Sequence, residues 1–479
     1  MLKKILIILG SGLFLLIIIL VFNTLTFPRY TSQYDMITPV EVPEIALERF
    51  QKSIPFPTIS YIEREKMDTA AFLGFHRYLT ESYPEVEKNL EKKVINQYSL
   101  LYKWTGKDPA DQAVVFMAHM DVVPVDTSTP EAWEAPPFSG QVKDGKVYGR
   151  GTMDDKINII ALLEAAELLI KEGFQPQQDI YFAFGHDEEI GGQEGAKKIA
   201  EYLASENTDI AFAIDEGGNI VEGMVAGFNR PLALVNVGEK GFVSFKLTIQ
   251  TNGGHSSAPP PDNTIGSLAR AIVKLEENQF EYQSTPLVDE QLSAIGAGFD
   301  QFFYRMAFAN KWLFKPFLLK AVNAHTTTAP TMINGGVKDN VIPTQASAVV
   351  NFRIMSGGSV EEVKQHIIET IQDDRIKIEP ISNVDEPSPV SETNSASFQL
   401  IEKTILQLFP ETVVAPGLLG AGTDSKHYIG VADNVYRFYP TRISPENLTC
   451  FHGNNEHITV ENYFETIQFN YQLMKNLSE

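Results

Sequence analysis

The sequence predicts an α/β protein that has a mainly parallel sheet with flanking helices and a smaller inserted α+β domain. Three apolar runs of strand length carry this prediction, at residues 112–121, 179–189 and 209–218. Two stretches with apolar residues at helical spacing, 154–173 and 194–205, lie between them. Apolar strands that alternate with helices indicate a parallel sheet with helices on both faces.

The chain begins with a segment typical of a membrane anchor. Lys3 and Lys4 precede an uncharged apolar run from Ile5 to Phe22, and about 20 such residues span a bilayer. No clear small-x-small cleavage site follows, so a retained anchor at residues 1–25 is favoured over a cleaved signal peptide. The lysines favour a cytoplasmic N-terminus, with the catalytic domain on the non-cytoplasmic side. If the segment is cleaved, the protein is secreted.

The pattern after the anchor predicts several segments. Residues 26–50 look like a polar, Pro-containing stalk. Near Val237 the strands begin to alternate polar and apolar residues, at 239–251 and 346–354, and helical patterns follow each of them. We therefore expect a catalytic domain that is split into residues 51–236 and residues 381–479, with the inserted α+β domain at 237–380 between them.

Composition excludes some classes of function. The chain of 479 residues has a formal net charge of −22, which disfavours a nucleic-acid partner. Cys450 is the only cysteine, so an internal disulfide and a Cys-rich zinc site are both excluded. Any metal must therefore be held by His, Asp and Glu.

Each of the three apolar strands ends in residues of the types that bind metal ions. In open α/β sheets, ligand sites lie at the carboxyl ends of the strands. If the strands are neighbours, these side chains converge on one crevice. They are His119 and Asp121, then Asp187, Glu188 and Glu189, and then Asp215 and Glu216.

Two further segments could add ligands. Asp154 and Asp155 stand at the start of the helix over 154–173, where they are either N-caps or ligands. Near the C-terminus, either His452 or His457 could complete the shell of a second ion. Zinc accepts imidazole and carboxylate ligands, and two ions about 3.5–4 Å apart need a bridging carboxylate.

A set of motifs in chain order resembles the di-zinc aminoacylase and carboxypeptidase family, closest to its branch of carboxypeptidase S and the N-fatty-acyl-amino-acid synthase/hydrolases. The resemblance runs from roughly residue 50 to the C-terminus and implies a di-zinc exopeptidase-like fold. The motifs are AHMDVVP, WEAPPFSG, YGRGTMDDK, GHDEEIGG, DEGG, GHSSAPP, NVIP, NFRI, GTDS and HGNNE.

The resemblance implies a role for each residue of the metal site and two Zn²⁺ ions per chain. His119 and Asp215 hold one ion, Glu189 and His452 hold the other, and Asp154 bridges them. Asp121 orients His119, and Glu188 is the unligated general base. His452 is favoured over His457 because it directly precedes the Gly-x-Asn-Glu motif.

The resemblance also implies substrate contacts. His255 stabilises the oxyanion, often across the interface of a homodimer, so the insert is a lid and dimerisation domain. Asn340 and Arg353 grip a substrate carboxylate, for which a planar guanidinium is well suited. Gly422 and Thr423 belong to a substrate-side loop. Ala421 departs from the family pattern there, so the fine contacts of that loop do not follow from the resemblance.

These roles imply a zinc-dependent hydrolase that cleaves an amide bond next to a free carboxylate. A carboxypeptidase or dipeptidase is the first expectation, and an N-acyl-amino-acid hydrolase or synthase is the alternative. A scaffold protein without activity is disfavoured because all of the expected ligands and the base are present. The aromatic segment at residues 299–322 could line an acyl pocket, cover the core of the insert or lie against a membrane.

Overall fold

The catalytic body is built on a mixed sheet whose central strands are parallel. The computed structural model describes residues 1–108, 111–126, 128, 130–381 and 384–478. At the centre of the sheet lie β6 (Ile180–Gly185), β3 (Ala113–His119), β7 (Ile210–Asp215) and β17 (Ala432–Arg437), in this order and all parallel. The predicted α/β class with a mainly parallel sheet is confirmed.

Helices cover both faces of this sheet, as the apolar strands require. Val114 and Phe116 of β3 pack in the core beneath α5 (Lys156–Lys171) and α13 (Val460–Asn476). Their neighbours Val115 and Met117 point to the opposite face, which α6 (Ala196–Ser205) covers. Successive strand residues alternate between faces, so a strand buried on both sides has no polar positions.

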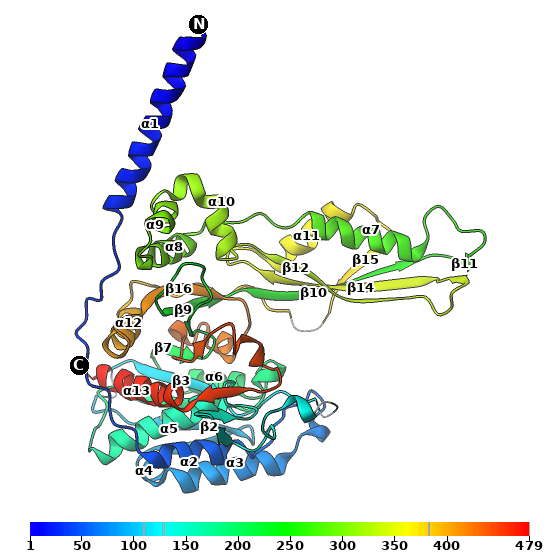
Figure 1. Ribbon diagram of the computed structural model, residues 1–479. Helices are drawn as coiled ribbons and strands as arrows, with labels where there is room; N and C mark the ends of the chain where they lie inside the picture. Colours follow the sequence, from blue (N-terminus) through cyan, green and yellow to red (C-terminus); the bar gives the residue numbers. More distant parts are fainter. Residues whose placement is uncertain (109–110, 127, 129, 382–383, 479) are drawn as a thin grey trace.

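Shorter elements complete the body (Figure 1). Antiparallel strands extend one edge of the main sheet, and four more strands extend the other. The edge strands are β2 (Ser99–Trp104) and β1 (Glu91–Ile95), and then β9 (Leu232–Glu239), β16 (Val413–Leu419), β8 (Ile220–Val221) and β18 (Arg442–Ile443). A separate small sheet contains β4 (Gln141–Lys143), β5 (Lys146–Tyr148) and β19 (His457–Thr459). The remaining helices of the body are α2 (Glu44–Ser53), α3 (Thr69–Ser82), α4 (Pro84–Asn89) and α12 (Ala396–Leu408), with single 3₁₀ turns at Arg64–Lys66, Pro130–Ala132, Glu188–Ile190, Asp424–Tyr428 and Leu448–Cys450.

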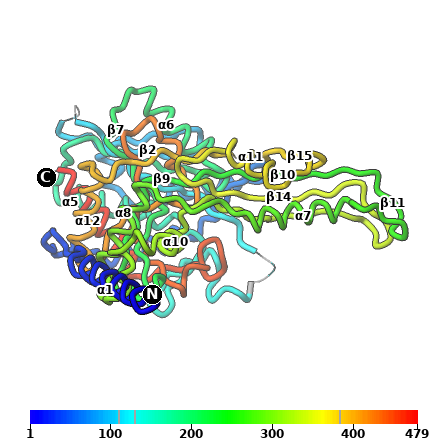
Figure 2. Tube along the Cα trace, turned by 90° about the horizontal axis from the view of Figure 1, so that it is seen from above, coloured from blue at the N-terminus to red at the C-terminus, as the bar shows by residue number. Residues whose placement is uncertain are grey.

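The inserted domain forms a long arm that projects from the body (Figures 1 and 2). Its sheet has the order β12-β14-β10-β15 and packs against two helices. A short pair of strands lies at the far end of the arm. The elements are β10 (Gly241–Gln250), β12 (Thr327–Gly335), β14 (Gln345–Ile354), β15 (Ile376–Pro380), α7 (Thr264–Glu277) and α11 (Val360–Ile371), with β11 (Gly254–His255) and β13 (Val341–Ile342) at the tip.

Three helices in the middle of the insert do not belong to the arm. They are α8 (Pro286–Gly298), α9 (Phe302–Ala309) and α10 (Lys311–Ala321). Leu292 of α8, Phe308 of α9 and Leu319 of α10 share a core with Val413 of β16. The N-terminal helix α1 (Leu2–Thr26) projects away from the body beside these helices (Figure 1).

The segment that we expected to be a stalk instead packs along the body. The backbone N–H of Tyr30 donates to the carbonyl of Ala297, and that of Ile37 donates to the carbonyl of Gln407. Tyr30 and Val40 pack against the main core. Helix α2 already begins at Glu44, within the expected stalk. The apolar side chains between the polar residues explain why this segment does not extend freely into solvent.

Candidate metal centre and substrate cavity

The carboxyl ends of β3, β6 and β7 bring the predicted polar residues to one edge of the sheet. His119 is the last residue of β3, and in the parallel ladder it lies beside Gly185, the last residue of β6. The turn that contains Glu188 and Glu189 follows β6 directly, and Asp215 ends β7. This arrangement is the one expected for a ligand site in a sheet of this class.

Two overlapping groups of side chains in the described part of the chain have the geometry of metal sites. His119, Asp154 and Glu216 form one, Asp154, Glu189 and His452 form the other, and the ligand atoms within each lie within 4.8 Å of one another. The Asp154 oxygens are 2.9 Å from His119 Nε2 and 3.0 Å from His452 Nε2. Asp154 is therefore the carboxylate that the two groups share.

The structure places Glu216, not Asp215, beside His119. Glu216 Oε1 lies 3.3 Å from His119 Nε2, whereas Asp215 belongs to neither group. Asp215 Oδ1 instead accepts the backbone N–H of Glu216. Both residues follow an apolar strand, and a shift of one position along a strand turns the side chain to the other face. Our assignment of Asp215 is therefore corrected to Glu216, a residue that we had noted without giving it a role.

The charges and hydrogen bonds of these side chains indicate that they bind metal ions and do not merely share protons with one another. Burial raises the pKa of Glu216 to about 8, and hydrogen bonds to Asp154 and Glu189 raise the pKa of His452 to about 10. Glu189 Oε1 is buried and has no hydrogen-bond partner among the described residues. Carboxylates crowded around imidazoles in this way need positive charge, which cations supply.

Asp121 holds other residues of the centre in place through hydrogen bonds. The His119 Nδ1 atom lies 2.9 Å from the backbone oxygen of Asp121 and 3.4 Å from its carboxylate. The same carboxylate accepts the backbone N–H groups of Glu188 and Glu189, each at 3.1 Å, and the hydroxyl of Ser60 at 2.6 Å. One buried aspartate thus holds both the imidazole and the acidic turn in place.

Glu188 adjoins the centre without joining it. It belongs to neither group of potential ligands, and its place at the start of a 3₁₀ turn is held by the bond from its N–H to Asp121. Burial raises its pKa well above the usual range, and the nearby negative charges of Asp424 and Glu216 act in the same direction. A half-buried carboxyl with a raised pKa is suited to accept and return a proton.

Sequence reasoning missed a buried ion pair that joins two site loops. Glu456 Oε1 accepts the N–H groups of Gly151 and Met153, at 3.0 and 2.8 Å. Its other oxygen lies 2.6 Å from Arg150, and Arg150 also donates to the carbonyl of His452. The pair thereby connects the loop before Asp154 to the loop that carries His452. The glutamate of the HGNNE motif was the available signal.

A basic cavity of about 350 Å³ adjoins the acidic turn. Arg353 and Gly422 both line it, as we expected for substrate contacts. His427, also in its wall, lies 3.0 Å from the carbonyl oxygen of Gly191, at the end of the Glu188 turn. The other cationic residues of the wall are Lys197, Lys240 and Lys426, and its acidic residues are Glu239, Asp385 and Glu386. Asp385 pairs with Lys426 at 3.1 Å, so Arg353 and Lys240 are the cations best placed to attract an anionic group.

Three expected substrate residues lie elsewhere in this single chain. His255 and the loop of Asn340 are at the far end of the arm, where His255 pairs with Val341 (Figure 2). Thr423 is buried and donates to Glu239 at 2.6 Å. Thr423 therefore holds the loop from inside, and His255 lies at the arm tip, away from the metal centre of its own chain.

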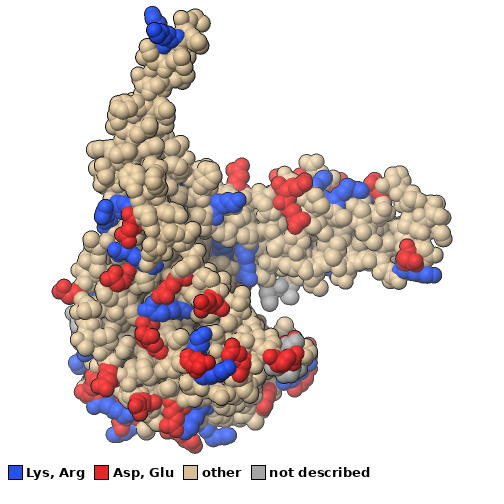
Figure 3. All heavy atoms as spheres, viewed as in Figure 1, with Lys and Arg blue, Asp and Glu red and all other residues tan. Residues whose placement is uncertain are grey.

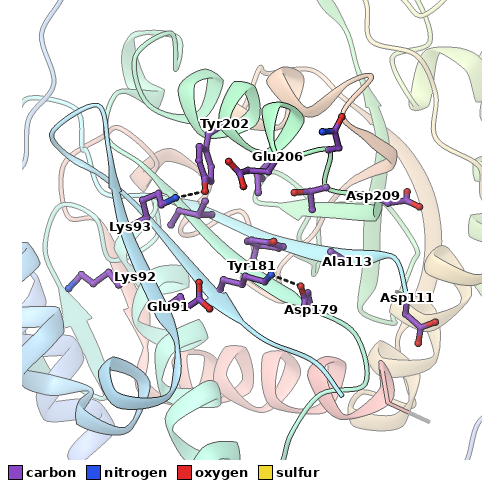
Figure 4. A pocket seen from close by; sticks show the side chains of 15 residues that line it. Glu91, Lys92, Lys93, Asp111, Ala113, Asp179, Tyr181, Tyr202, Glu206 and Asp209 are labelled. Carbon is purple, nitrogen blue, oxygen red and sulfur yellow. Dashed lines mark hydrogen bonds and ion pairs between the residues drawn. The ribbon is translucent and has the colours of Figure 1, made fainter. Parts of the chain in front are cut away.

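A different cavity, of about 420 Å³, lies away from the candidate metal residues (Figure 4). Strands β1 and β2 and helix α6 contribute to its walls. Two of its lysines bond other residues of the wall, because Lys103 pairs with Asp179 at 2.8 Å and Lys93 bonds the hydroxyl of Tyr202. We therefore place the chemistry at the strand ends and not in this cavity.

Comparisons with known proteins agree with this geometry. The family model described as Peptidase family M20/M25/M40 matches residues 115–476. Probable carboxypeptidase S-like 2 of Dictyostelium discoideum is 40% identical, over 96% of this chain and 92% of its own length. An N-fatty-acyl-amino acid synthase/hydrolase of Danio rerio is 39% identical, over 92% of this chain and 87% of its own. Carboxypeptidase S of Saccharomyces cerevisiae is 32% identical, over 85% and 79%.

Solved structures share the fold at low identity. A metallo-carboxypeptidase of Sulfolobus solfataricus superposes with a TM-score of 0.68 at 18% identity, covering 91% of this chain and 100% of its own. Human carnosine dipeptidase 1 gives a TM-score of 0.66 at 15% identity, covering 92% and 100%. At these identities the likeness concerns the fold alone.

Proposed function

Because the chain belongs to peptidase family M20/M25/M40 and is therefore a metallopeptidase or amidohydrolase, we propose that it hydrolyses an amide bond next to a free carboxylate. The observation that carries the proposal is the pair of ligand groups that share Asp154, with the half-buried Glu188 and a cavity lined by Arg353 and Lys240 alongside. This combination suits an amide whose amine side ends in a carboxylate.

Two Zn²⁺ ions are the cofactors that we propose. His119 and Glu216 would hold one, Glu189 and His452 the other, and Asp154 would bridge them. Imidazole and carboxylate ligands suit zinc. When bound, such ions polarise the amide carbonyl and lower the pKa of the attacking water.

Glu188 carries the proton in the proposed reaction. Its carboxylate takes a proton from the water as the water oxygen attacks the amide carbon, and it then delivers that proton to the nitrogen as the C–N bond breaks. The products are a carboxylic acid and a free amine.

Arg353 and Lys240 are the groups that we propose to bind the substrate carboxylate. Both line the basic cavity, and Gly422 lies in its wall. A guanidinium binds a carboxylate through two parallel hydrogen bonds, which fixes its direction as well as its position. A carboxypeptidase or dipeptidase is the first candidate that this arrangement suits, because both cleave next to a free C-terminal carboxylate.

An N-acyl-amino-acid hydrolase or synthase is the second candidate, and a specific cavity supports it. This cavity of about 220 Å³ also reaches Arg353. Its wall contains the apolar side chains of Leu287, Val288, Val322 and Leu418, which suit a hydrocarbon chain. The relatives named as N-fatty-acyl-amino acid synthase/hydrolases make this candidate worth testing beside the first.

A substrate panel tests the proposed function. Purified full-length protein loaded with zinc is assayed with dipeptides, with N-acyl amino acids of short and long chains, and with the amides of the same compounds that lack a free carboxylate. We expect hydrolysis of carboxylate-bearing substrates only. Equal rates on the amidated controls would show that the carboxylate is not recognised. Whether dipeptides or N-acyl amino acids are hydrolysed faster decides between the two candidates.

We propose that helix α1 anchors the enzyme to a membrane. The helix has 25 residues with a mean hydropathy of 3.2 in its most apolar window, and that window is fully exposed, so it is long and apolar enough to cross a bilayer. With its N-terminus in the cytoplasm, the catalytic body lies on the other side. If α1 is removed as a signal peptide, the body is secreted.

We also propose a homodimer in which His255 reaches the partner's metal centre. His255 is exposed at the arm tip, far along the chain's own arm from the body (Figure 2). Met332, Ile333 and Val337 of the same arm are large exposed apolar residues, as is common where a surface is covered by a partner. The donated imidazole would stabilise the oxyanion of the partner's substrate.

A further inference from the structure

The surface of α9 and α10 beside the anchor helix carries an unusual concentration of exposed aromatic side chains. Phe303 is 76% exposed, Phe317 is 75% exposed and Trp312 is 60% exposed. Three further exposed apolar residues accompany them, Phe302, Tyr304 and Leu313. Isolated exposed apolar residues are ordinary, but a contiguous patch on a soluble body marks an interaction surface.

The opposite side of the same two helices is a packed core. Phe308, Leu318 and Leu319 are buried against α8 and β16. Packing of the body therefore accounts for one side of α9 and α10 and leaves the exposed aromatic residues without a structural role. Helices of this kind, apolar on both sides, are stable at a surface only if something apolar covers the outer side.

Direct contacts place this surface level with the end of the apolar run of α1. Asn310, which joins α9 to α10, donates to the carbonyl of Leu20 at 3.2 Å and accepts from the Asn23 side chain at 2.9 Å. The apolar run of α1 ends at Phe22. A helix rises about 1.5 Å per residue, so α9 and α10 meet α1 within one turn of the point where the anchor leaves the hydrocarbon.

The joint between the anchor and these helices is fixed. Arg305 of α9 donates to the carbonyl of Phe27 at 2.7 Å, and its guanidinium lies over the Phe27 ring. Phe27 and Tyr30 also pack against the core of α8 to α10. These contacts couple the direction of α1 to the orientation of the aromatic surface, and Figure 1 shows the end of α1 beside α9.

The charge of the segment fits a bilayer surface. Between residues 302 and 324 the basic residues are Arg305, Lys311, Lys315 and Lys320, with no Asp or Glu, in a chain whose net charge is −22. The region where α1 joins the body is mostly tan in Figure 3, the colour of uncharged residues. Aromatic residues flanked by lysines are typical of the interface between lipid headgroups and acyl chains.

We propose that α9 and α10 form a membrane platform that lies in the headgroup region of the same bilayer that α1 spans. The exposed side chains of Phe303, Trp312 and Phe317 enter the interface, and Lys315 and Lys320 stay at the level of the phosphates. Arg305 and Lys311 instead bond groups of the protein itself. The platform holds the body against the membrane and brings the end of α10 to the lipid surface. Val322 and Asn323, which follow α10, line the apolar cavity that reaches Arg353.

Tryptophan fluorescence in vesicles tests the platform. Trp312 is exposed, whereas the other tryptophans, Trp104 and Trp133, are buried in the body. The full-length chain is reconstituted into phosphatidylcholine vesicles with or without bromine on the upper acyl carbons. Because bromine quenches only nearby indoles, we expect about a twofold loss of the Trp312 emission, and W312F lacks this component.

Matched variants keep the test independent of folding. The double substitution Phe303→Ser and Phe317→Ser is expected to abolish most of the quenching of Trp312, while flotation with vesicles and activity on a soluble substrate stay unchanged. Ile62→Ser, at a 79% exposed position on the body, is the control and is expected to leave the quenching as in the unsubstituted chain.

The outcomes separate the platform from the anchor on which it rests. A chain that floats with vesicles but shows no quenching of Trp312 would overturn the platform and leave the anchor standing. A chain that does not float would overturn both. In nanodiscs that hold a single chain, no second copy can cover the aromatic surface, and quenching of Trp312 is still expected. Quenching that appears only with two chains per disc would also overturn the platform.

Discussion

Asp154 Oδ2 lies 3.0 Å from His452 Nε2, although 298 positions of sequence separate the two residues. The other oxygen of Asp154 faces His119 at 2.9 Å. A bridging carboxylate is the one ligand whose loss affects both ions, so Asp154→Ala is expected to reduce the metal content from about two ions per chain to well below one. Elemental analysis of the purified protein measures this change.

His452→Ala provides the matched comparison for Asp154→Ala. His452 belongs to only one of the two ligand groups, so this variant is expected to keep about one ion per chain. Two retained ions in Asp154→Ala would contradict the bridging role. Equal metal loss in both variants would instead indicate that the two sites fill only together.

Glu188→Gln separates proton transfer from metal binding. The substitution keeps the size of the side chain and removes its ability to accept a proton, so turnover is expected to fall by about 10²–10⁴-fold. Metal content is expected to stay at the unsubstituted level because Glu188 is in neither ligand group. Steady-state rates and elemental analysis are measured on the same preparation.

Glu194→Gln is the control for Glu188→Gln, because it removes a carboxylate from the same loop. Its side chain is 44% exposed and pairs with Arg64 at 2.8 Å. Activity of this control is expected to match that of the unsubstituted chain. If Glu188→Gln kept most of its activity, the proton would have to be carried by another group.

Glu216→Gln and Asp215→Asn distinguish the two neighbours at the end of β7. Glu216 lies 3.3 Å from His119, and Asp215 bonds only a backbone N–H among its described contacts. Loss of a residue that only supports a metal ligand typically weakens metal binding by about 10–100-fold. Glu216→Gln removes a proposed ligand itself, so it is expected to weaken the binding of one ion by more than this. Titration with zinc after chelation measures the affinity. A normal affinity in Glu216→Gln with a loss in Asp215→Asn would restore the sequence-based assignment.

Asp215 and Glu216 show which features of the site could be predicted from the sequence and which could not. Apolar runs ending in acids correctly predicted the strands and the edge where the site lies, and the family match confirms the resemblance drawn from the motifs. Which of two adjacent acids faces His119 depends on the twist of the backbone after β7. Spacing alone does not determine this, because both acids stand at a strand end.

Other features depended on contacts that no local pattern encodes. The buried pair of Arg150 and Glu456 joins residues more than 300 positions apart. The expected stalk packs on the body because Tyr30 finds the carbonyl of Ala297, in a helix of the insert. The aromatic segment at 299–322 divides between a packed core on one side of its helices and an exposed surface on the other, and its composition alone does not distinguish these two sides.

Lys240 gives the proposed substrate binding a dependence on pH. Burial lowers its pKa to about 8, and its ammonium donates to the carbonyls of Asn323 and His325 at 2.9 and 2.8 Å. Below pH 8 the group is charged and attracts a carboxylate, and above pH 8 it becomes neutral. KM for a carboxylate substrate is therefore expected to increase roughly several-fold as the pH rises above about 8.

Lys240→Met is expected to remove this rise in KM and to leave KM high at all pH values, with little change in kcat. Steady-state kinetics measured from about pH 6.5 to about pH 9.5 show how KM and kcat change with pH. Lys377→Met, at an exposed position on β15, is the control that keeps the pH dependence. An unchanged alkaline rise of KM in Lys240→Met would assign it to a different group.

Complementation between chains tests whether His255 acts across a dimer. His255 is exposed at the arm tip, whereas Glu188 lies in the body, in the turn after β6. His255→Ala and Glu188→Gln are each expected to lose most of their activity. In a mixed dimer, however, one site contains Glu188 from one chain and receives His255 from the other. Random pairing of equal amounts makes about a quarter of all sites complete.

Co-expression of the two variants is therefore expected to recover about a quarter of the unsubstituted activity per site, although neither variant is active alone. Dilution that dissociates the dimers removes the recovered activity, and a tag on each chain allows mixed dimers to be isolated and counted. If His255 served its own chain, every site in the mixture would lack one group and no activity would return. The arm would then have to bend back to its own body, against the extended position in which β10 and β14 hold its tip.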